Sequence, residues 1–339
     1  MGHCDDVISG VRNQIDASDA PLGEVRTRLT FVKKIADGFA GALRTYSSGS
    51  IAHHTMIAPV TDGDGGVVLD RRCYPELGPE GGGEAPREVA EKLCALLGPE
   101  IRERYPHARC GTSKRGPKIY FGEPVEGQDP TVDLVIALTR RESEGLWIPN
   151  LKKDTWEASD PERHAVLFNG GALAVRRTRR QVIRLAKAWN RQFSDPAFCS
   201  FHLSALALES VQGGLGLPAA LGQFFADAAS SLRRGNTADP AGVSPPIRLR
   251  VNRDAAIARL DKAAEAVTRA LEHDDDLPAV QASLAIVFWD YSESPEVSPL
   301  ASAVRTLRPR TSVTTTSLGL AGAAALVRPA RAYGGAIRP

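Results

Sequence analysis

Three aspartates in the first half of the chain are of the residue type that binds divalent cations. Asp62 and Asp64 stand two residues apart, so on extended backbone both carboxylates point to one face. Asp133 lies at the start of an apolar stretch, 132–138, which predicts a strand that could lie beside another over 66–70. Three carboxylates on one sheet face repel one another unless cations neutralise them. Magnesium prefers hard oxygen ligands such as these. Two such ions about 3.5–4 Å apart suit the transfer of a phosphorus-containing group from one oxygen atom to another.

A Gly-Ser pair precedes the carboxylates and could hold a phosphate. Gly49 tolerates a tight backbone close to phosphate oxygens, and Ser50 adds a hydroxyl donor. Residues 51–61 separate the pair from Asp62, which is enough chain for a strand to run back to the same cleft. Paired aspartates are common on exposed loops, and Gly-Ser alone is less specific still. Their combination with Asp133 favours a site for metal and nucleotide phosphate.

Helical and strand patterns both occur in the first part of the chain. Apolar residues recur at helical spacing over residues 5–47, and Pro21 is expected to separate two helices, the second ending near Ser47–Ser50. After this turn the period changes, and we expect strands over 66–70, 118–121 and 132–138 and a helix over 84–104. This mixture predicts a first lobe that contains both helices and a sheet.

The second part of the chain is predicted to be helical. Amphipathic patterns indicate helices over 175–193, 201–211, 217–232, 253–273 and 277–288, with a linker over 236–246. From residue 292 onward the sequence has little periodicity. We therefore divide the chain into a catalytic core with N-terminal helices (1–165), a helical lobe (166–291) and a C-terminal segment or tail (292–339).

Composition restricts the class of protein further. Lys and Arg number 42 and Asp and Glu 40, so the net charge of +2 excludes a generally polyanion-binding surface. Five cysteines without a C-x-x-C motif fit free thiols in a reducing cytoplasm. No secretory leader is evident, and no stretch approaches the roughly 18 consecutive apolar residues that cross a bilayer. We expect a soluble cytoplasmic protein without a membrane partner.

The stretch from Gly49 to Asp70 resembles the signature of a nucleotidyltransferase family. That family contains the oligoadenylate synthetases, cyclic GMP-AMP synthase and the bacterial CD-NTases. In its members a Gly-Ser pair is followed by acidic-x-acidic and by a third acidic residue on a later strand. The similarity covers roughly residues 35–290 and is closest to the bacterial branch. It implies an α+β, two-lobed, polymerase-beta-like fold with a mixed-sheet catalytic core and a helical lobe.

Further matches imply roles for residues of the second lobe. The segment 181–190 resembles the family's helix with a phosphate-contacting lysine, here Lys187. Ser200 and Phe201 resemble its Ser-Tyr step, with Phe in place of Tyr. The resemblance implies that Lys187 and Ser200 contact the donor triphosphate, and Phe201 could stack on the donor base. Residues 147–164 look like the segment that joins the core to the helical lobe.

Two departures from the family pattern have consequences. Gly63 stands between the paired acids where a hydrophobic residue is more usual, and we expect it to loosen this end of the strand. The zinc-binding insertion of the animal DNA sensor is absent, which argues against activation by nucleic acid through that route. The adjacent His53 and His54 should point in opposite directions on a strand, with a solvated or substrate-proximal role.

The resemblance implies a specific reaction. Asp62, Asp64 and Asp133 would hold two Mg²⁺ ions, with Mn²⁺ as an alternative, while nucleoside triphosphates such as ATP and GTP are joined and pyrophosphate is released. The product would be a cyclic di- or trinucleotide that switches on a separate effector protein in anti-phage (CBASS) signalling. Three alternatives stay open: a linear or untemplated polymerising nucleotidyltransferase, an aminoglycoside-modifying nucleotidyltransferase, and an inactive nucleotide-binding scaffold.

Overall fold

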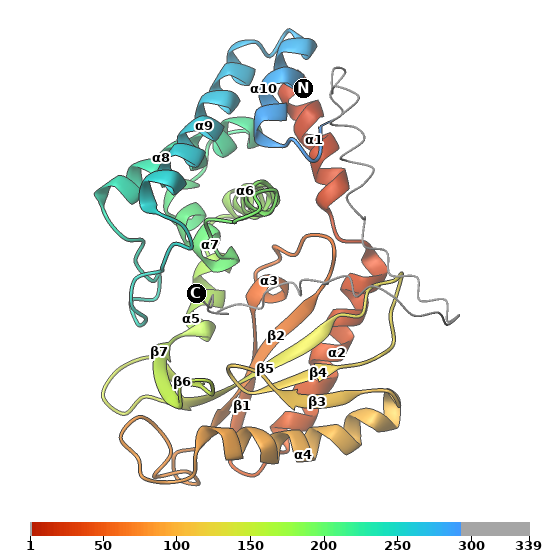
Figure 1. Cartoon of the computed structure of the whole chain (residues 1–339), viewed down its shortest axis with the longest axis vertical. Coiled ribbons are helices and arrows are strands. Elements are labelled where there is room, and N and C mark those ends of the chain that lie inside the picture. The colour runs from red at the N-terminus through yellow and green to blue at the C-terminus, as the bar shows by residue number, and fades with distance from the viewer. Residues whose placement is uncertain (1, 293–339) are drawn as a thin grey trace, which may run out of the picture.

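The computed structural model describes residues 2–292, so the predicted tail over 292–339 lies outside the described residues apart from Ser292 (Figure 1). The strands are β1 (Ala42–Ser48), β2 (Asp62–Leu69), β3 (Arg109–Thr112), β4 (Pro117–Tyr120), β5 (Thr131–Thr139), β6 (Leu146–Asn150) and β7 (Thr155–Ser159). The helices are α1 (His3–Ile15), α2 (Asp19–Asp37), α3 (Gly49–Ala52), α4 (Pro86–Arg104), α5 (Pro161–Asn169), α6 (Leu173–Arg191), α7 (Ser200–Ser210), α8 (Leu217–Arg234), α9 (Arg253–Glu272) and α10 (Leu277–Val287).

All seven described strands form one mixed sheet. The order is β1-β2-β5-β4-β3, while β6 pairs with β5 and β7 pairs with β6. The central strands β2 and β5 are parallel, and the other pairs are antiparallel. The buried apolar halves of β2 and β5 suit central strands that are covered by other elements. Their parallel pairing aligns the two segments that carry the predicted metal ligands.

Helices α2 and α4 pack against the sheet through a shared hydrophobic cluster. Leu29 and Val32 of α2 and Leu93 and Leu97 of α4 are buried there with apolar residues of β2 and β5. At Gly63 a Cβ atom would lie 3.0 Å from Cγ2 of Val25, so the missing side chain lets α2 lie close to β2. Gly63 is buried under this helix, and the expectation that it loosens this end of the strand stays a prediction.

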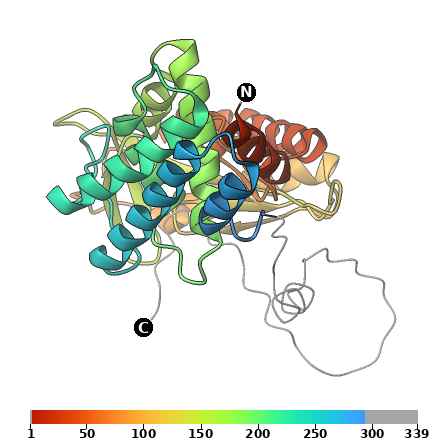
Figure 2. The same cartoon turned by 90° about the horizontal axis from the view of Figure 1, so that it is seen from above.

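The helical lobe surrounds α6, which crosses its interior (Figure 1). Trp189 of α6 is buried and packs edge-on against Phe225 of α8, with ring centroids 5.0 Å apart. Helix α1 belongs to the same hydrophobic cluster, through Ile8 and Val11 among others. Figures 1 and 2 both place α1 beside α10. The two N-terminal helices therefore divide between the lobes, and the boundary at residue 165 stays a prediction.

Most of the expected elements are present, but one helix was predicted too long. Helix α2 ends at Asp37, and the strand β1 occupies Ala42–Ser48, where we expected helix to continue. Gly41 explains the break, because its φ of +78° suits a turn and not a helix interior. The short strands β3, β6 and β7 were not predicted. The helices expected over 84–104 and through the second lobe are confirmed within a few residues. None of the helices within residues 2–292 is long and apolar enough to cross a membrane.

A buried hydrogen bond between a histidine and an aspartate joins α5 to the loop after α8. Nε2 of His164 lies 2.5 Å from Oδ1 of Asp239, whose side chain is fully buried. Oδ2 of Asp239 accepts hydrogen bonds from the backbone N–H groups of Val243 (3.0 Å) and Ser244 (2.8 Å). Burial raises the pKa of Asp239, but these hydrogen bonds and His164 outweigh burial and hold the pKa below its usual value. The carboxylate therefore stabilises the fold in its charged form.

We predict that Asp239→Asn lowers the free energy of unfolding by about 1–3 kcal/mol at neutral pH, because buried donors lose a charged acceptor. A carboxyl group whose folded-state pKa is lowered contributes stability above its unfolded-state pKa and loses it as the pH falls through its folded-state pKa. The difference between wild type and variant, measured by urea unfolding, should therefore shrink on acidification. Asp275→Asn, at an exposed position, is the control. A difference that is independent of pH would contradict this role.

Candidate metal and nucleotide site

The structure brings the three predicted carboxylates together. Asp64 of β2 and Asp133 of β5 are opposite each other in the parallel register, and Asp62 is the first residue of β2. Each of the three offers a carboxylate oxygen, and these oxygens all lie within 4.8 Å of one another. All three residues are half-buried. Strand pairing, and not the chain order alone, therefore creates this cluster.

Mutual repulsion makes the cluster costly when it holds no cation. Burial, followed by the charges of Asp62 and Asp133, raises the pKa of Asp64 to about 8. Burial likewise raises the pKa of Asp133, although nearby hydrogen-bond donors oppose this effect. A divalent cation would relieve both penalties, and oxygen donors at this spacing are the ligands that hard cations prefer. The donor set thus fits a magnesium-type ion.

Lys118 is a member of the site that sequence reasoning missed. It is opposite Asp133 in the register of β4 and β5, and its Nζ donates to Oδ2 of that aspartate. Burial lowers the pKa of Lys118, but the hydrogen bond and the charges of Asp133 and Asp62 outweigh burial and raise it. Lys118 therefore supplies positive charge beside the carboxylates. A signal was present, because Lys118 is the one charged residue in the strand segment 117–121.

The Gly-Ser turn lies directly against the carboxylates. Strand β1 leads into the single helical turn α3, which begins at Gly49 with a φ of +63°. A Cβ atom at Gly49 would lie 1.9 Å from Oδ2 of Asp64, so a side chain there would displace the carboxylate. Ser50 is half-buried, and its Oγ donates to Sδ of Met56 at 3.5 Å. The expected placement of turn and carboxylates at one location is thus present.

The segment after Ser50 is held in place by the helical lobe. Each contact joins a side-chain donor of α5 or α6 to a backbone carbonyl oxygen, so it does not depend on the side chains of the segment. The three donors contact the carbonyl oxygens of every third residue of this segment: Asn169 to Ala52 (2.9 Å), Lys187 to Thr55 (2.9 Å) and Arg191 to Ala58 (2.5 Å). Asn169 also accepts from Arg180 at 2.7 Å, which fixes its amide. The two lobes are therefore joined at the Gly-Ser turn.

Lys187, which we expected to contact phosphate, is buried between α6 and this segment. Its Nζ donates to the carbonyl of Thr55 and to Oγ1 of Thr55 (3.0 Å). Burial, followed by the charge of Arg191, lowers the pKa of Lys187 to about 7, against the opposing effect of Asp62 and Asp64. The position of Lys187 near the carboxylates suits a phosphate contact, because an anion beside it would favour its charged form.

Ser200 and Phe201 lie at the first turn of α7. Ser200 is exposed, and its carbonyl accepts from Oγ of Ser204 at 3.1 Å. The ring of Phe201 packs against His164 (centroids 4.7 Å apart) and edge-on against Phe168 (5.8 Å). Phe201 therefore extends an aromatic cluster that begins at α5. Base stacking by Phe201 stays a prediction.

The two adjacent histidines differ from expectation. His53 is buried against Phe168, with centroids 4.7 Å apart, and burial followed by the charge of Lys187 lowers its pKa to about 3. A solvated role for His53 is therefore wrong. His54 is exposed with a φ of +57°, in the left-handed region, and neither histidine lies on a strand. Both histidines follow the helical turn α3, where we expected a strand.

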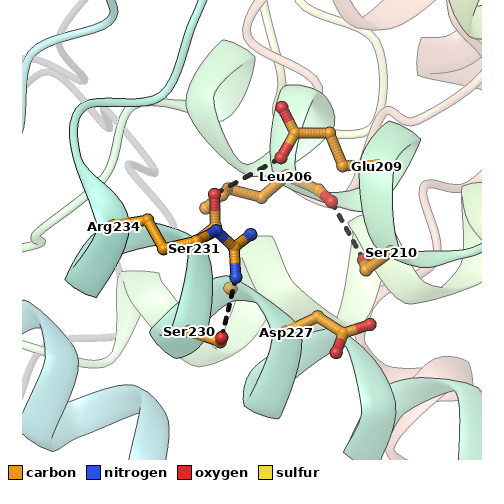
Figure 3. A pocket seen from close by; sticks show the side chains of 8 residues that line it. Leu206, Glu209, Ser210, Asp227, Ser230, Ser231 and Arg234 are labelled. Atoms are coloured by element: carbon orange, nitrogen blue, oxygen red, sulfur yellow. Dashed lines mark hydrogen bonds between the residues drawn. The ribbon is translucent and has the colours of Figure 1, made fainter.

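A separate cavity of about 160 Å³ lies between α7 and α8, away from these residues (Figure 3). Oγ of Ser231 donates to Glu209 at 3.4 Å, and Arg234 donates to Oγ of Ser230 at 2.9 Å. The polar groups of the cavity thus largely bond to one another. None of the predicted site residues lines it.

Comparison with known proteins identifies the fold. No protein-family model matches the chain, and no curated protein matches it. Solved structures do match: the chain has the fold of the CD-NTases, a class of nucleotidyltransferase. CdnC of E. coli MS115-1, solved with ATP, is 17% identical over 87% of this chain and 99% of its own, with a TM-score of 0.63.

Two further structures support this assignment. The Bradyrhizobium diazoefficiens CD-NTase CdnG, solved with GTP, is 15% identical over 85% of this chain and 95% of its own, with a TM-score of 0.60. The Vibrio cholerae cyclic AMP-GMP synthase DncV is 16% identical over 72% of this chain and 68% of its own, with a TM-score of 0.52. The predicted α+β nucleotidyltransferase fold is therefore confirmed.

We predict that Gly49→Ala disrupts the carboxylate cluster. The added methyl group strains a left-handed backbone position, at a cost of about 1–2 kcal/mol, and displaces Asp64. Affinity for Mn²⁺, measured by titration calorimetry, should fall together with the thermal midpoint. The matched control is Gly10→Ala in α1, where a Cβ atom meets nothing within 4 Å. This control should retain metal affinity and be slightly more stable. Equal metal affinity in the two variants would contradict the prediction.

Proposed function

We propose that this chain is a metal-dependent nucleotidyltransferase that joins nucleoside triphosphates into a cyclic di- or trinucleotide. The observation that carries the proposal is the convergence of Asp62, Asp64 and Asp133 beside Gly49 in a chain with the CD-NTase fold. A carboxylate cluster of this kind is costly without cations, and a turn without a side chain leaves room beside it for phosphate oxygens.

ATP and GTP are the substrates that the comparison favours. CdnC was solved with ATP and CdnG with GTP, and both cover most of this chain. In the proposal Gly49 and Ser50 hold the donor triphosphate from the core, while Lys187 and Ser200 contact it from the helical lobe. Phe201 stacks on the donor base, since an aromatic face can hold any base. The nucleotide would thus lie between the two lobes.

The metal ligands have distinct parts in the proposal. Asp62 and Asp64 hold two Mg²⁺ ions, with Mn²⁺ as the alternative, and Asp133 completes the second site. Two such ions, when bound, activate the attacking hydroxyl and neutralise the pyrophosphate leaving group. Asp133 helps to remove the proton from the acceptor ribose hydroxyl. Lys118, which is bonded to Asp133, keeps this carboxylate oriented toward the cluster.

The first transfer would give a linear dinucleotide. This intermediate would then rebind in the site in a new orientation and close into a ring. By analogy with the matched cyclic dinucleotide synthases, the product would be a second messenger that acts on a separate effector protein in anti-phage (CBASS) signalling. The reaction would take place in the cytoplasm. The resemblance of residues 35–290 to the bacterial branch supports this role.

The proposal is tested by product analysis. The purified chain is incubated with all four ribonucleoside triphosphates and Mg²⁺ or Mn²⁺, and the products are identified by mass spectrometry. A cyclic di- or trinucleotide together with pyrophosphate is the expected result. Linear oligomers would instead assign a polymerising nucleotidyltransferase. The absence of any product, while ATP or GTP still binds, would assign a nucleotide-binding scaffold.

We predict that the double variant Asp62→Ala/Asp64→Ala abolishes nucleotide incorporation and leaves the thermal midpoint unchanged or higher. Two mutually repelling carboxylates are removed, so the fold loses no favourable contact between them. The matched control is Glu142→Ala/Glu144→Ala, an exposed acidic pair with the same spacing. This control should keep full activity. Activity in the Asp62/Asp64 variant would rule out the mechanism.

We predict that Phe201→Ala raises the KM for the donor nucleotide about tenfold with a smaller effect on kcat. Stacking on a base is worth roughly 1–3 kcal/mol, and this energy is lost with the ring. Steady-state kinetics measure both constants. Phe201→Tyr keeps the aromatic face and should retain the wild-type KM. An unchanged KM in the alanine variant would assign Phe201 to packing against His164 and Phe168 alone.

A further inference from the structure

Two cysteines that are far from the carboxylate cluster in sequence meet between α4 and the edge strand β3. Sγ of Cys110 donates to Sγ of Cys94, and the two sulfur atoms are 2.8 Å apart. Sγ of Cys94 in turn donates to the carbonyl oxygen of Gly111 at 3.4 Å. Both cysteines are half-buried. All five cysteines lie within residues 2–292, and the described contacts join only these two to each other.

Their surroundings allow a covalent bond with little movement. A disulfide needs sulfur atoms about 2.03–2.05 Å apart, so the two atoms have to approach by less than about one ångström. Helix α4 packs directly on β3, and β3 pairs on one side only, with β4. An edge strand of four residues can adjust more easily than a central strand. The surroundings of Cys94 and Cys110 therefore differ from those of Cys4, which is buried in the hydrophobic core without a second thiol in contact with it among the described residues.

We propose that Cys94 and Cys110 form a reversible dithiol–disulfide pair that a peroxide closes and a thiol reductant opens. In the first step the thiolate of Cys94 attacks a peroxide oxygen, the O–O bond breaks, and Cys94 becomes a sulfenic acid. The sulfur of Cys110 then attacks the sulfur of Cys94, its proton leaves with the hydroxyl group, and the S–S bond forms. Two thiols and one hydrogen peroxide thus give one disulfide and two waters.

The hydrogen bond between the thiols favours this order of steps. Donation from Cys110 lowers the pKa of Cys94, against the opposing effect of burial, while the same contact raises the pKa of Cys110. The thiolate is the reactive form of cysteine, so Cys94 reacts first and Cys110 resolves the sulfenic acid. Cys73, by contrast, is exposed and has no neighbouring thiol among the described contacts.

The bond would connect α4 to the hairpin that flanks the carboxylate cluster. Cys110 is opposite Ile119 in the register of β3 and β4, next to Lys118, which bonds to Asp133. A cross-link between Cys94 and Cys110, which are 16 positions apart in the chain, also restricts the unfolded chain. The oxidised protein should therefore be more stable, with a stiffer β3–β4 edge.

The test uses the full chain, oxidised with equimolar hydrogen peroxide and digested without reductant. Peptide mapping by mass spectrometry should find one peptide pair that joins Cys94 to Cys110, lighter by two hydrogen atoms than the separate thiols. Dithiothreitol should reverse the change. The thermal midpoint should rise by several degrees on oxidation and return on reduction.

Three variants make the result specific. Cys73→Ser removes an exposed thiol and should leave both the linked peptide and the thermal shift unchanged. Cys94→Ser and Cys110→Ser should each abolish both. Sulfinic acids on Cys94 and Cys110 without the linked peptide, or disulfides between copies through Cys73, would overturn the proposal. If a serine variant does not fold, peptide mapping of the wild type decides the question alone.

Discussion

Repulsion among three carboxylates is the constraint on which the arrangement of this molecule depends. The parallel pairing of β2 and β5 aligns Asp64 with Asp133, and Asp62 begins the same strand. The surroundings partly offset the resulting repulsion, through the ion pair with Lys118 and through the nearby charge of Lys187. Burial, followed by the charges of Asp62 and Asp133, nevertheless raises the pKa of Asp64 to about 8. The protein thus accepts an unfavourable charge distribution near the start of its central strands β2 and β5, which a bound cation would correct.

The two lobes contribute to this site in different ways. The sheet supplies the carboxylates through strand register, which α2 and α4 support from one side. The helical lobe supplies donors that hold the chain after the Gly-Ser turn, and its own core is formed around Trp189. Lys187 contributes both to holding this segment and to the charge around the carboxylates, because it bonds to Thr55 and lies near the carboxylates. A change in the packing of either lobe would therefore alter the other at this place.

The sequence alone was sufficient for the parts of the structure that depend on local pattern. Amphipathic spacing located α4 and the helices of the second lobe, and alternate spacing placed Asp62 and Asp64 on one face. It was insufficient where distant segments decide the outcome. The short strands β3, β6 and β7 owe their form to pairing with other strands. Likewise Lys118 enters the site through its register with Asp133, and His53 is buried only because Phe168 comes from a later helix.

The carbonyl groups of Ala52, Thr55 and Ala58 have one further consequence. Every residue type carries a main-chain carbonyl, so these attachments survive replacement of the side chains along the segment as long as its path is kept. The hydrogen-bond donors, by contrast, are the side chains of Asn169, Lys187 and Arg191, so replacement of these residues would remove the hydrogen bonds. Evolutionary change in this region is therefore expected to fall on the held segment and to spare the holding helices. A chain built in this way can keep its shape while sharing few residues with others, as the 17% identity with CdnC illustrates.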